Sequence, residues 1–410
     1  MNQVHSKASL AIVFLTVFID LLGFGMVLPL LPAYAAQFTV DEAGWTIGLL
    51  MSSFSAMQFL FAPVWGRISD RIGRRPVLMI GLAGSVVFYT VFGIAAMQRS
   101  LWLLFVSRIG AGISGATIST AQAYIADATG LEGRTRGMAL IGAAFGLGFT
   151  FGPLIGAAAL FASEDHGASP WPGYAAAALS AVAFVLAAVK LPESLRPDSA
   201  SAAHHLVDVR AFGEALKTPS ILLLLVTSFV SVMSFANFES TLSLLLKDTK
   251  NGFGFSYEQV LLAFAYVGLV LTFAQGFLVR RLAKRLPESV LATTGACVSI
   301  AGFLTLAWSV SSASFAWLMV GLFVEVTGFS FMTPSIQSLI SRRSDPNRQG
   351  GILGVGQSAS AMARIVGPVV GIRLFYVGAT LPFLMAAGLM AGALVLVGVA
   401  VRRGKDYGAA

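Results

Sequence analysis

Residues 66–97 read GRISDRIGRRPVLMIGLAGSVVFYTVFGIAAM, a charged turn followed by an uncharged apolar run at 77–97. An α-helix rises 1.5 Å per residue, so a run of about 20 apolar residues crosses the hydrocarbon core of a bilayer. The segment therefore predicts a membrane-spanning helix that begins at a basic turn.

The rest of the chain repeats this pattern. Of 410 residues, 56% are hydrophobic and only 11% are charged, against about 25% charged in ordinary soluble domains. This composition excludes a soluble globular enzyme and a disordered chain. The runs do not alternate as β-barrel strands would, and lipid leaves unpaired backbone groups unsatisfied, so we expect helices. Twelve apolar stretches are present, at 8–36, 45–66, 77–97, 101–126, 136–161, 172–191, 219–246, 256–279, 289–309, 313–340, 350–376 and 379–401.

The basic residues indicate orientation. If both termini are cytoplasmic, 21 of the 27 Lys and Arg fall in inner segments and 3 in outer ones, as the positive-inside rule requires for an even number of helices. The net charge of +8 therefore reflects topology, and we expect no nucleic-acid partner. No cleavage site ends the first apolar stretch, so it is interpreted as a retained helix in a multi-pass cell (inner) membrane protein. The single Cys297 excludes an internal disulfide.

The chain divides into two similar halves. The longest polar connection, 192–218, separates a predicted six-helix bundle at 1–191 from a second at 219–410. EGRTRG precedes GFTFGPLIGA in the first half, and PNRQGG precedes RIVGPVVGIR in the second, with offsets of 214 and 215 residues. The predicted fold is thus an all-α polytopic membrane protein with twelve helices in two pseudo-symmetric halves, an arrangement common in transporters.

Two segments carry a family resemblance. The turn GRISDRIGRRPVL, 66–78, resembles the loop between helices two and three of the major facilitator superfamily. The stretch FIDLLGFGMVLPLLP, 18–32, resembles the first helix of its drug–proton antiporter branch, which includes tetracycline exporters.

Two further segments support that resemblance. RIGAGISGA, 108–116, is similar to the fourth-helix motif, with Ala111 where Gln is frequent. GFTFGPLIGA, 148–157, is similar to the fifth-helix motif of antiporters, ending in Ala157 instead of a second Gly. The resemblance implies a proton-coupled exporter.

The turn at 66–78 predicts a cytoplasmic gate. Asp70 and Arg74 are four residues apart and pair on one face if the helix continues. The resemblance also places Asp70 at the start of the eleventh helix, near Gly350, and we expect Asp127 to partner the Arg cluster. The alternative is a simple positive-inside anchor. The gate residues are Gly66, Asp70, Arg71, Gly73, Arg74, Arg75 and Asp127.

Charges inside apolar stretches suggest the coupling site, because an ionisable group in hydrocarbon is costly and faces a cavity or a partner. Asp20 lies midway along the first stretch. We expect it to carry a proton or bind a cation. As a proton carrier it would take the proton up when a basic partner moves away and release it when that partner returns. The resemblance makes Arg108 the candidate partner; a static buried pair is the alternative.

Further residues are expected to line a substrate cavity. Arg108, Gly112, Gly115, Ser119 and Gln122 recur at helical spacing and form a polar, small-residue stripe. Tight helix packing would select the same residue types. Phe24 is a candidate aromatic lining residue.

The second half carries two buried acids. Glu239, beside Asn237, is expected to couple protons or bind a cationic substrate, or else to be a hydrogen-bonded residue at a helix break. Glu325, with Phe329 one turn away, is expected to bind an amphipathic cation or to take part in proton coupling. Arg364, which shares a face with Gln357, is an alternative partner that would neutralise Glu325. The residues expected to line the substrate cavity in this half are Asn237, Phe329, Gln357 and Arg364.

The fifth apolar helix is expected to pack closely on a neighbour. Gly148, Gly152 and Gly156 have four-residue spacing, which permits close approach in membranes. Pro153 removes one backbone hydrogen bond and can kink the helix.

The sequence therefore predicts a secondary active transporter that exports amphipathic organic molecules in exchange for protons, by alternating access. Export or flipping of a native metabolite, sugar conjugate or lipid, and passive facilitation, remain alternatives. No GxxxxGK[ST] loop is present and all four His lie in ends or loops, so we expect neither ATP hydrolysis nor another enzymatic activity. The expected partners are a small-molecule substrate, protons and the bilayer. We expect no cofactor and no metal, and a functional monomer.

Overall fold

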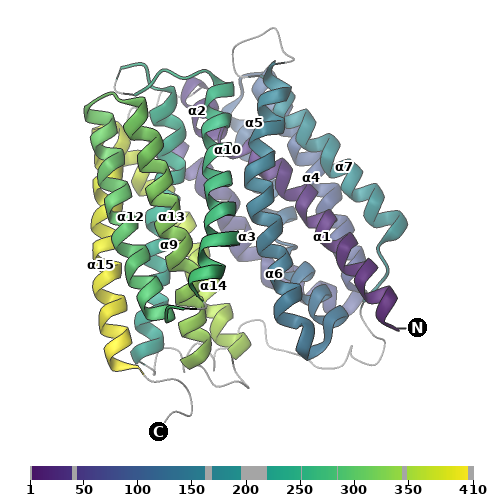
Figure 1. Ribbon diagram of the computed structural model, residues 1–410. Coiled ribbons are helices and arrows are strands. Elements are labelled where there is room, and N and C mark those ends of the chain that lie inside the picture. The colour runs from purple at the N-terminus through teal and green to yellow at the C-terminus, as the bar shows by residue number, and fades with distance from the viewer. Residues whose placement is uncertain are drawn as a thin grey trace. The chain divides into compact units, whose positions relative to one another are not determined.

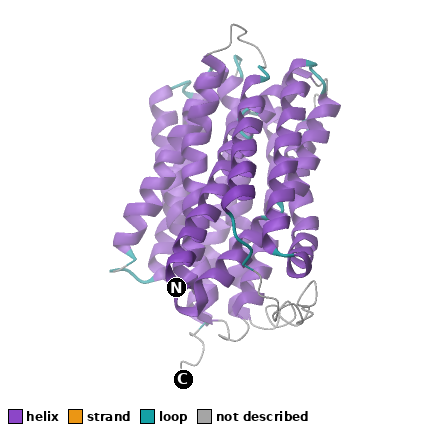
Figure 2. Cartoon of the chain, turned by 90° about the vertical axis from the view of Figure 1, so that its right-hand side faces the viewer, coloured by secondary structure: helices purple, strands orange, loops and turns teal. Residues whose placement is uncertain are grey.

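The computed structural model describes residues 2–38, 44–161, 169–194, 219–250, 252–283, 285–343 and 349–404. Throughout these ranges the regular elements are helices (Figures 1 and 2). This agrees with the all-helical prediction. The linker expected at 192–218 lies outside the described residues except for 192–194.

The helices of the first half run from α1 to α7. They are α1 Asn2–Val27, α2 Leu31–Phe38, α3 Trp45–Ile72, α4 Arg74–Met97, α5 Leu101–Gly115, α6 Ile118–Phe161 and α7 Trp171–Lys190. Those of the second half follow from α9 onward. They are α9 Pro219–Lys247, α10 Tyr257–Phe273, the π-helical turn η2 Ala274–Val279, α11 Arg280–Leu282, α12 Glu288–Ser311, α13 Phe315–Arg343, α14 Gln349–Val377 and α15 Leu381–Arg403.

Length and composition make most of these helices membrane spans. Within the described ranges, ten are long and apolar enough to cross a bilayer, and two shorter apolar helices, Leu101–Gly115 and Ala144–Leu160, accompany them. Their outer faces suit lipid, since Trp102, Val189 and Val395 are 73%, 74% and 65% exposed.

Several predicted stretches are interrupted. The first, expected at 8–36, breaks between α1 and α2 at 28–30, where Pro29 cannot donate to a helix. The fourth, expected at 101–126, ends as α5 at Gly115, and α6 begins at Ile118. The helix expected to carry Asp70 and Arg74 together does not continue, because Gly73 has φ +104 between α3 and α4, a conformation that only glycine adopts readily.

The chain forms two compact units. The first contains Met1–Val40, Ser53–Leu206 and Phe255–Leu269, and the second contains Asp41–Ser52, Val207–Gly254 and Val270–Ala410. In the first unit, α1 packs on α6 and α7, and α4 packs on α5 and α7. In the second, α12 packs on α13, and α9 packs on α14 and α15.

Glycines allow helices to approach closely inside each unit. A Cβ on Gly152 of α6 would lie 2.6 Å from the Leu22 carbonyl oxygen of α1. A Cβ on Gly367 of α14 would lie 3.1 Å from the Asn237 nitrogen of α9. Both members of the second pair are 215 residues beyond those of the first, so the repeat seen in the sequence is also a repeat of helix contacts.

Candidate functional site

Asp20 lies in the first unit, on the face of α1 that packs against α4. The Ser85 hydroxyl of α4 is hydrogen-bonded to its carboxylate, while Asp20 Oδ1 has no hydrogen-bond partner among the described residues. The side chain also lines a small cavity between α1, α4 and the start of α6. Asp20 therefore lies inside the helical unit, beside a polar hollow.

Tyr89 links Asp20 electrostatically to Arg108. Its side chain interacts with both of these charged groups, and its ring packs 2.9 Å from where a Gly23 Cβ would be. Within the described residues Asp20 and Arg108 form no direct ion pair. The buried acid and the buried base are therefore arranged around a tyrosine.

Arg108 of α5 lies among aromatic rings. Its guanidinium carbon is 4.4 Å from the centre of the Phe54 ring and 5.9 Å from that of Phe24. Phe24 also contacts Phe149 of α6, with 5.8 Å between ring centres. Arg108 is 1% exposed and its Nε has no hydrogen-bond partner in the described part of the chain. The rings stabilise the cation by cation–π interaction.

The stripe predicted along α5 is a packing surface at its centre. A Cβ on Gly112 would lie 2.5 Å from the Phe54 carbonyl oxygen, and one on Gly115 would lie 3.3 Å from Gln58 Nε2. Helix α5 ends at Gly115, so the regular spacing does not continue to Ser119 and Gln122. The side chains of Ser119 and Gln122 lie outside the described part of the chain.

The fifth apolar helix, now part of α6, packs on α1 through its glycines. A Cβ on Gly148 would lie 2.8 Å from Leu21 Cβ, and one on Gly156 would lie 3.3 Å from Met26 Cγ. Pro153 lies inside the continuous helix α6. These contacts fix the position of α1 along α6, and therefore the position of Asp20.

Three charged residues come together in the second unit. Glu239 of α9 interacts with Arg364 of α14 and with Glu325 of α13. Glu325 is fully buried, and neither of its carboxyl oxygens has a hydrogen-bond partner among the described residues. Arg364 thus lies within electrostatic range of Glu239, and its neutralisation of Glu325 stays a prediction.

Near the three charged residues lie stacked aromatic rings and a hydrogen bond that joins two helices. Phe329 of α13 stacks on Phe235 of α9, with 4.1 Å between ring centres, and Gln357 of α14 is exposed. Asn237, expected to line a cavity, is 0% exposed and donates a 2.7 Å hydrogen bond to the Pro382 carbonyl of α15. It joins two helices instead, because its amide satisfies a carbonyl at the start of α15.

The repeat places different chemistry at matching positions. Phe24 and Phe149, which touch in the first unit, correspond at the 215-residue offset to Glu239 and Arg364, which interact in the second. Asp20 likewise corresponds to Phe235. One backbone arrangement therefore presents an aromatic pair in one unit and an ion pair in the other.

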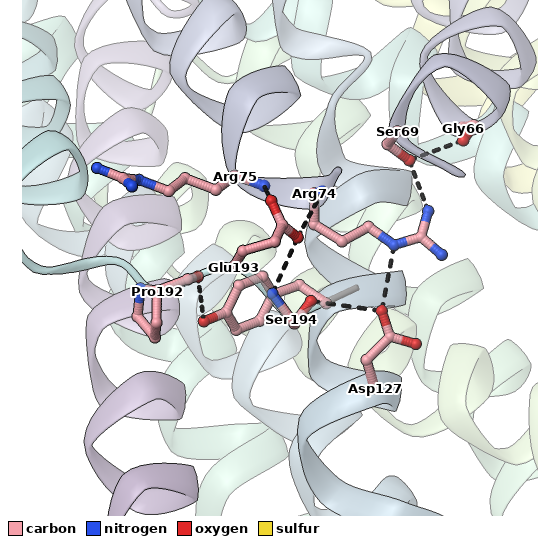
Figure 3. A network of polar contacts seen from close by, with 9 residues as sticks. Gly66, Ser69, Arg74, Arg75, Asp127, Pro192, Glu193 and Ser194 are labelled. Atoms are coloured by element: carbon pink, nitrogen blue, oxygen red, sulfur yellow. Dashed lines mark hydrogen bonds and ion pairs between the residues drawn. The ribbon is translucent and has the colours of Figure 1, made fainter. Parts of the chain in front are cut away.

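A polar network holds the start of α4 (Figure 3). Arg74 Nε lies 3.2 Å from Asp127 Oδ2 of α6, and the Arg74 guanidinium also donates to the Ser69 hydroxyl of α3. Glu193 accepts hydrogen bonds from the backbone N–H groups of Arg74 and Arg75, at 2.8 and 3.1 Å. A carboxylate at a helix N-terminus is favoured by the free N–H groups and the helix dipole.

Glu193 was missed by the sequence analysis, although LPES directly follows the sixth apolar run. Gly66 contributes a carbonyl that accepts from the Ser69 hydroxyl, and Arg71 is exposed. The side chain of Asp70 and the surroundings of Gly350 lie outside the described part of the chain. Nowhere in the described ranges do three His, Cys, Asp or Glu gather as metal ligands do.

Comparison with known proteins places the chain among transporters. The family model of the Major Facilitator Superfamily matches residues 13–368. The chain is 30% identical to the class C tetracycline resistance protein of Escherichia coli, over 97% of this chain and 98% of that protein. It is also 30% identical to major facilitator superfamily domain-containing protein 10 of Mus musculus, over 92% and 90%.

A solved structure extends the comparison to the fold. The human organic anion transporter MFSD10 (TETRAN) superposes with a TM-score of 0.70 at 27% identity, over 96% of this chain and 99% of that one.

Proposed function

The chain belongs to the major facilitator superfamily, and from this we propose that it is a proton-coupled antiporter that exports amphipathic organic molecules by alternating access. It is a multi-pass membrane transporter and not an enzyme. The proposal adds three properties: export, antiport and the use of protons.

The environment of Asp20 carries the proposal of proton coupling. A carboxylate fixed by a close arginine would remain charged, whereas among the described residues Asp20 interacts with the Ser85 hydroxyl and with Tyr89, and it borders a cavity. Such a group can gain and lose a proton as its surroundings change during the cycle. Glu239 and Glu325 form a second acidic site, in which Arg364 balances one charge.

Aromatic side chains beside the charges support an amphipathic substrate. Each unit combines a ring pair, Phe24 with Phe54 or Phe235 with Phe329, with a nearby charged residue. Flat apolar groups would stack on the rings and a charged end would meet the ionisable residue. Tetracycline resistance proteins among the relatives support export of drug-like compounds.

A second candidate is export of organic anions. Arg108 has aromatic neighbours and no carboxylate partner among the described residues, so an anionic substrate that reached it would supply the missing negative charge. MFSD10, described as an organic anion transporter, is the structural relative that favours this reading.

The proposal also covers the orientation of the chain in the membrane, the gate and the oligomeric state. The distribution of Lys and Arg supports cytoplasmic termini in the cell membrane. The Arg74 network would then lie on the cytoplasmic side, as part of a gate, and the protein would act as a monomer.

The test is transport by the purified protein in liposomes with an imposed pH gradient. The panel would contain tetracycline as a zwitterion, ethidium as a cation, an organic anion such as fluorescein and a neutral dye. We expect accumulation of at least one charged compound that collapses when an ionophore dissipates the pH gradient.

The controls separate the candidates. Fluorescein transport alone would favour the organic-anion function. Equal rates with and without the gradient, for every compound transported, would contradict proton coupling and leave a passive facilitator.

A further inference from the structure

The cavity beside Asp20 has polar walls on one side. It measures about 30 Å³ and is lined by α1, α4 and the start of α6. Thr16, one turn before Asp20 on α1, and Thr117, which precedes α6, are its two threonine lining residues. The Thr117 hydroxyl donates a 3.2 Å hydrogen bond to the Ser114 carbonyl. Apolar side chains complete the wall: Val17, Leu21, Leu78, Leu82, Ile118 and Ala121.

Two oxygens at this cavity lack protein partners. Thr16 is 2% exposed and its Oγ1 has no hydrogen-bond partner in the described part of the chain; the same holds for Asp20 Oδ1. A buried polar atom without a hydrogen-bond partner destabilises the folded protein. A cavity large enough for a water, with two or more polar groups to bond it, removes that cost when it is hydrated.

The cavity lies on a definite side of Asp20. Leu78 is one turn from Arg74 at the start of α4, and Ala121 lies two turns before Asp127 on α6. Between the cavity and this polar network, Val13, Leu78 and Tyr124 belong to one apolar cluster. The Tyr124 hydroxyl donates a 2.9 Å hydrogen bond to the Pro192 carbonyl, next to Glu193. The cavity therefore lies between Asp20 and the membrane face that bears the network, behind an apolar barrier.

We propose that this cavity holds water that exchanges a proton with Asp20, and that the Thr16 hydroxyl positions this water. The inference rests on the proposed proton coupling and adds the route by which the proton leaves Asp20. In the step, the Asp20 O–H bond breaks and an O–H bond to water forms, giving a carboxylate and a hydronium. The hydronium passes its excess proton to further water towards the network when the apolar barrier opens, so one proton moves and no electron does.

Few ionisable groups face Asp20. On α4, Tyr89 is within electrostatic range, and Arg108 of α5 lies beyond it. In the described parts of α6 and α7, no acid or base interacts with Asp20. Water in the cavity is thus the proton acceptor nearest to Asp20 on the side that faces the Arg74 network.

The test measures substrate-driven proton flux into liposomes that contain a pH-sensitive dye. The substrate is tetracycline, or whichever compound of the panel the wild type transports fastest. Thr16→Val removes the hydroxyl with little change in shape, Thr16→Ser retains it, and Ala121→Leu fills the cavity. Thr90→Val is the matched control, because the one bond of the Thr90 hydroxyl within the described residues is to the Val86 carbonyl of its own helix. Melting temperatures are recorded for all variants.

We expect Thr16→Val and Ala121→Leu to slow proton flux about ten-fold or more, as loss of a positioned proton-transfer group does. The half-saturating substrate concentration stays unchanged, and Thr16→Ser and Thr90→Val remain within about two-fold of wild type. A folded Thr16→Val variant with wild-type flux would overturn the inference, whatever Ala121→Leu does. If Asp20→Asn also keeps the flux, the proposed function fails as well; if Asp20→Asn abolishes it, only the water route fails.

Discussion

Replacing Gly152 by alanine tests whether close packing of α6 on α1 holds Asp20 in place. The added Cβ would lie 2.6 Å from the Leu22 carbonyl oxygen and 3.0 Å from the Gly25 backbone. Ordinary van der Waals contact begins at 3.4 Å, so the two helices must separate by about 0.8 Å. Both obstacles are backbone atoms, which cannot rotate away.

The size of the effect follows from two opposing contributions. Overpacking costs about 1–3 kcal/mol, and alanine in a helix gains about 1 kcal/mol over glycine. Gly152→Ala should therefore lower the free energy of unfolding by up to about 2 kcal/mol. Gly392 of α15 has no atom within 4 Å of its would-be Cβ, so Gly392→Ala should be neutral or stabilising. Gly156→Ala should lie between them, because its obstacles are side-chain atoms at 3.3 Å.

The assay compares melting temperatures of the three purified variants in one detergent, with transport measured in parallel. We expect the order Gly152→Ala, Gly156→Ala, Gly392→Ala from least to most stable, and the lowest transport rate in Gly152→Ala because α1 moves. Equal or greater stability of Gly152→Ala relative to Gly392→Ala would refute the packing argument.

Three further predictions concern the polar contacts. Glu193→Ala leaves the first N–H groups of α4 without their carboxylate, so amide exchange there should accelerate about five-fold, corresponding to roughly 1 kcal/mol for a partly exposed cap; unchanged exchange would show that Glu193 is dispensable. Asn237→Ala removes the bond to Pro382 and should lower the melting temperature while leaving substrate affinity unchanged, since the side chain is in a helix interface; a loss of affinity at normal stability would instead make it a cavity residue. Glu239→Gln combined with Arg364→Gln should be less destabilising than the sum of the two single changes by about 0.5–1 kcal/mol, measured by a double-mutant cycle; strict additivity would mean that the two charges do not interact.

Hydropathy and charge were enough to predict the helical membrane fold, because every span must satisfy its own backbone groups. The 215-residue repeat was also readable, and the structure shows it again in the Gly152 and Gly367 contacts. The breaks at 28–30 and 116–117 were not predicted, since short interruptions barely lower the hydropathy of a long apolar run.

Side-chain neighbours were much harder to predict. Helix periodicity assigns Gly112 to a face but does not say which helix covers that face, and Phe54 of α3 does. The role of Tyr89 between Asp20 and Arg108 depends on how three helices pack. Glu193 acts on residues about 118 positions away along the chain, so no local pattern predicts its partner.

Proton release on substrate binding tests the central claim most directly. The wild-type protein in weakly buffered detergent solution would be mixed with saturating tetracycline, or the best substrate of the panel, while a pH dye is monitored. Coupling through Asp20 predicts that binding acidifies the solution, and that the Asp20→Asn variant binds without this acidification. An equal pH change in both proteins, or none in the wild type, would contradict the account.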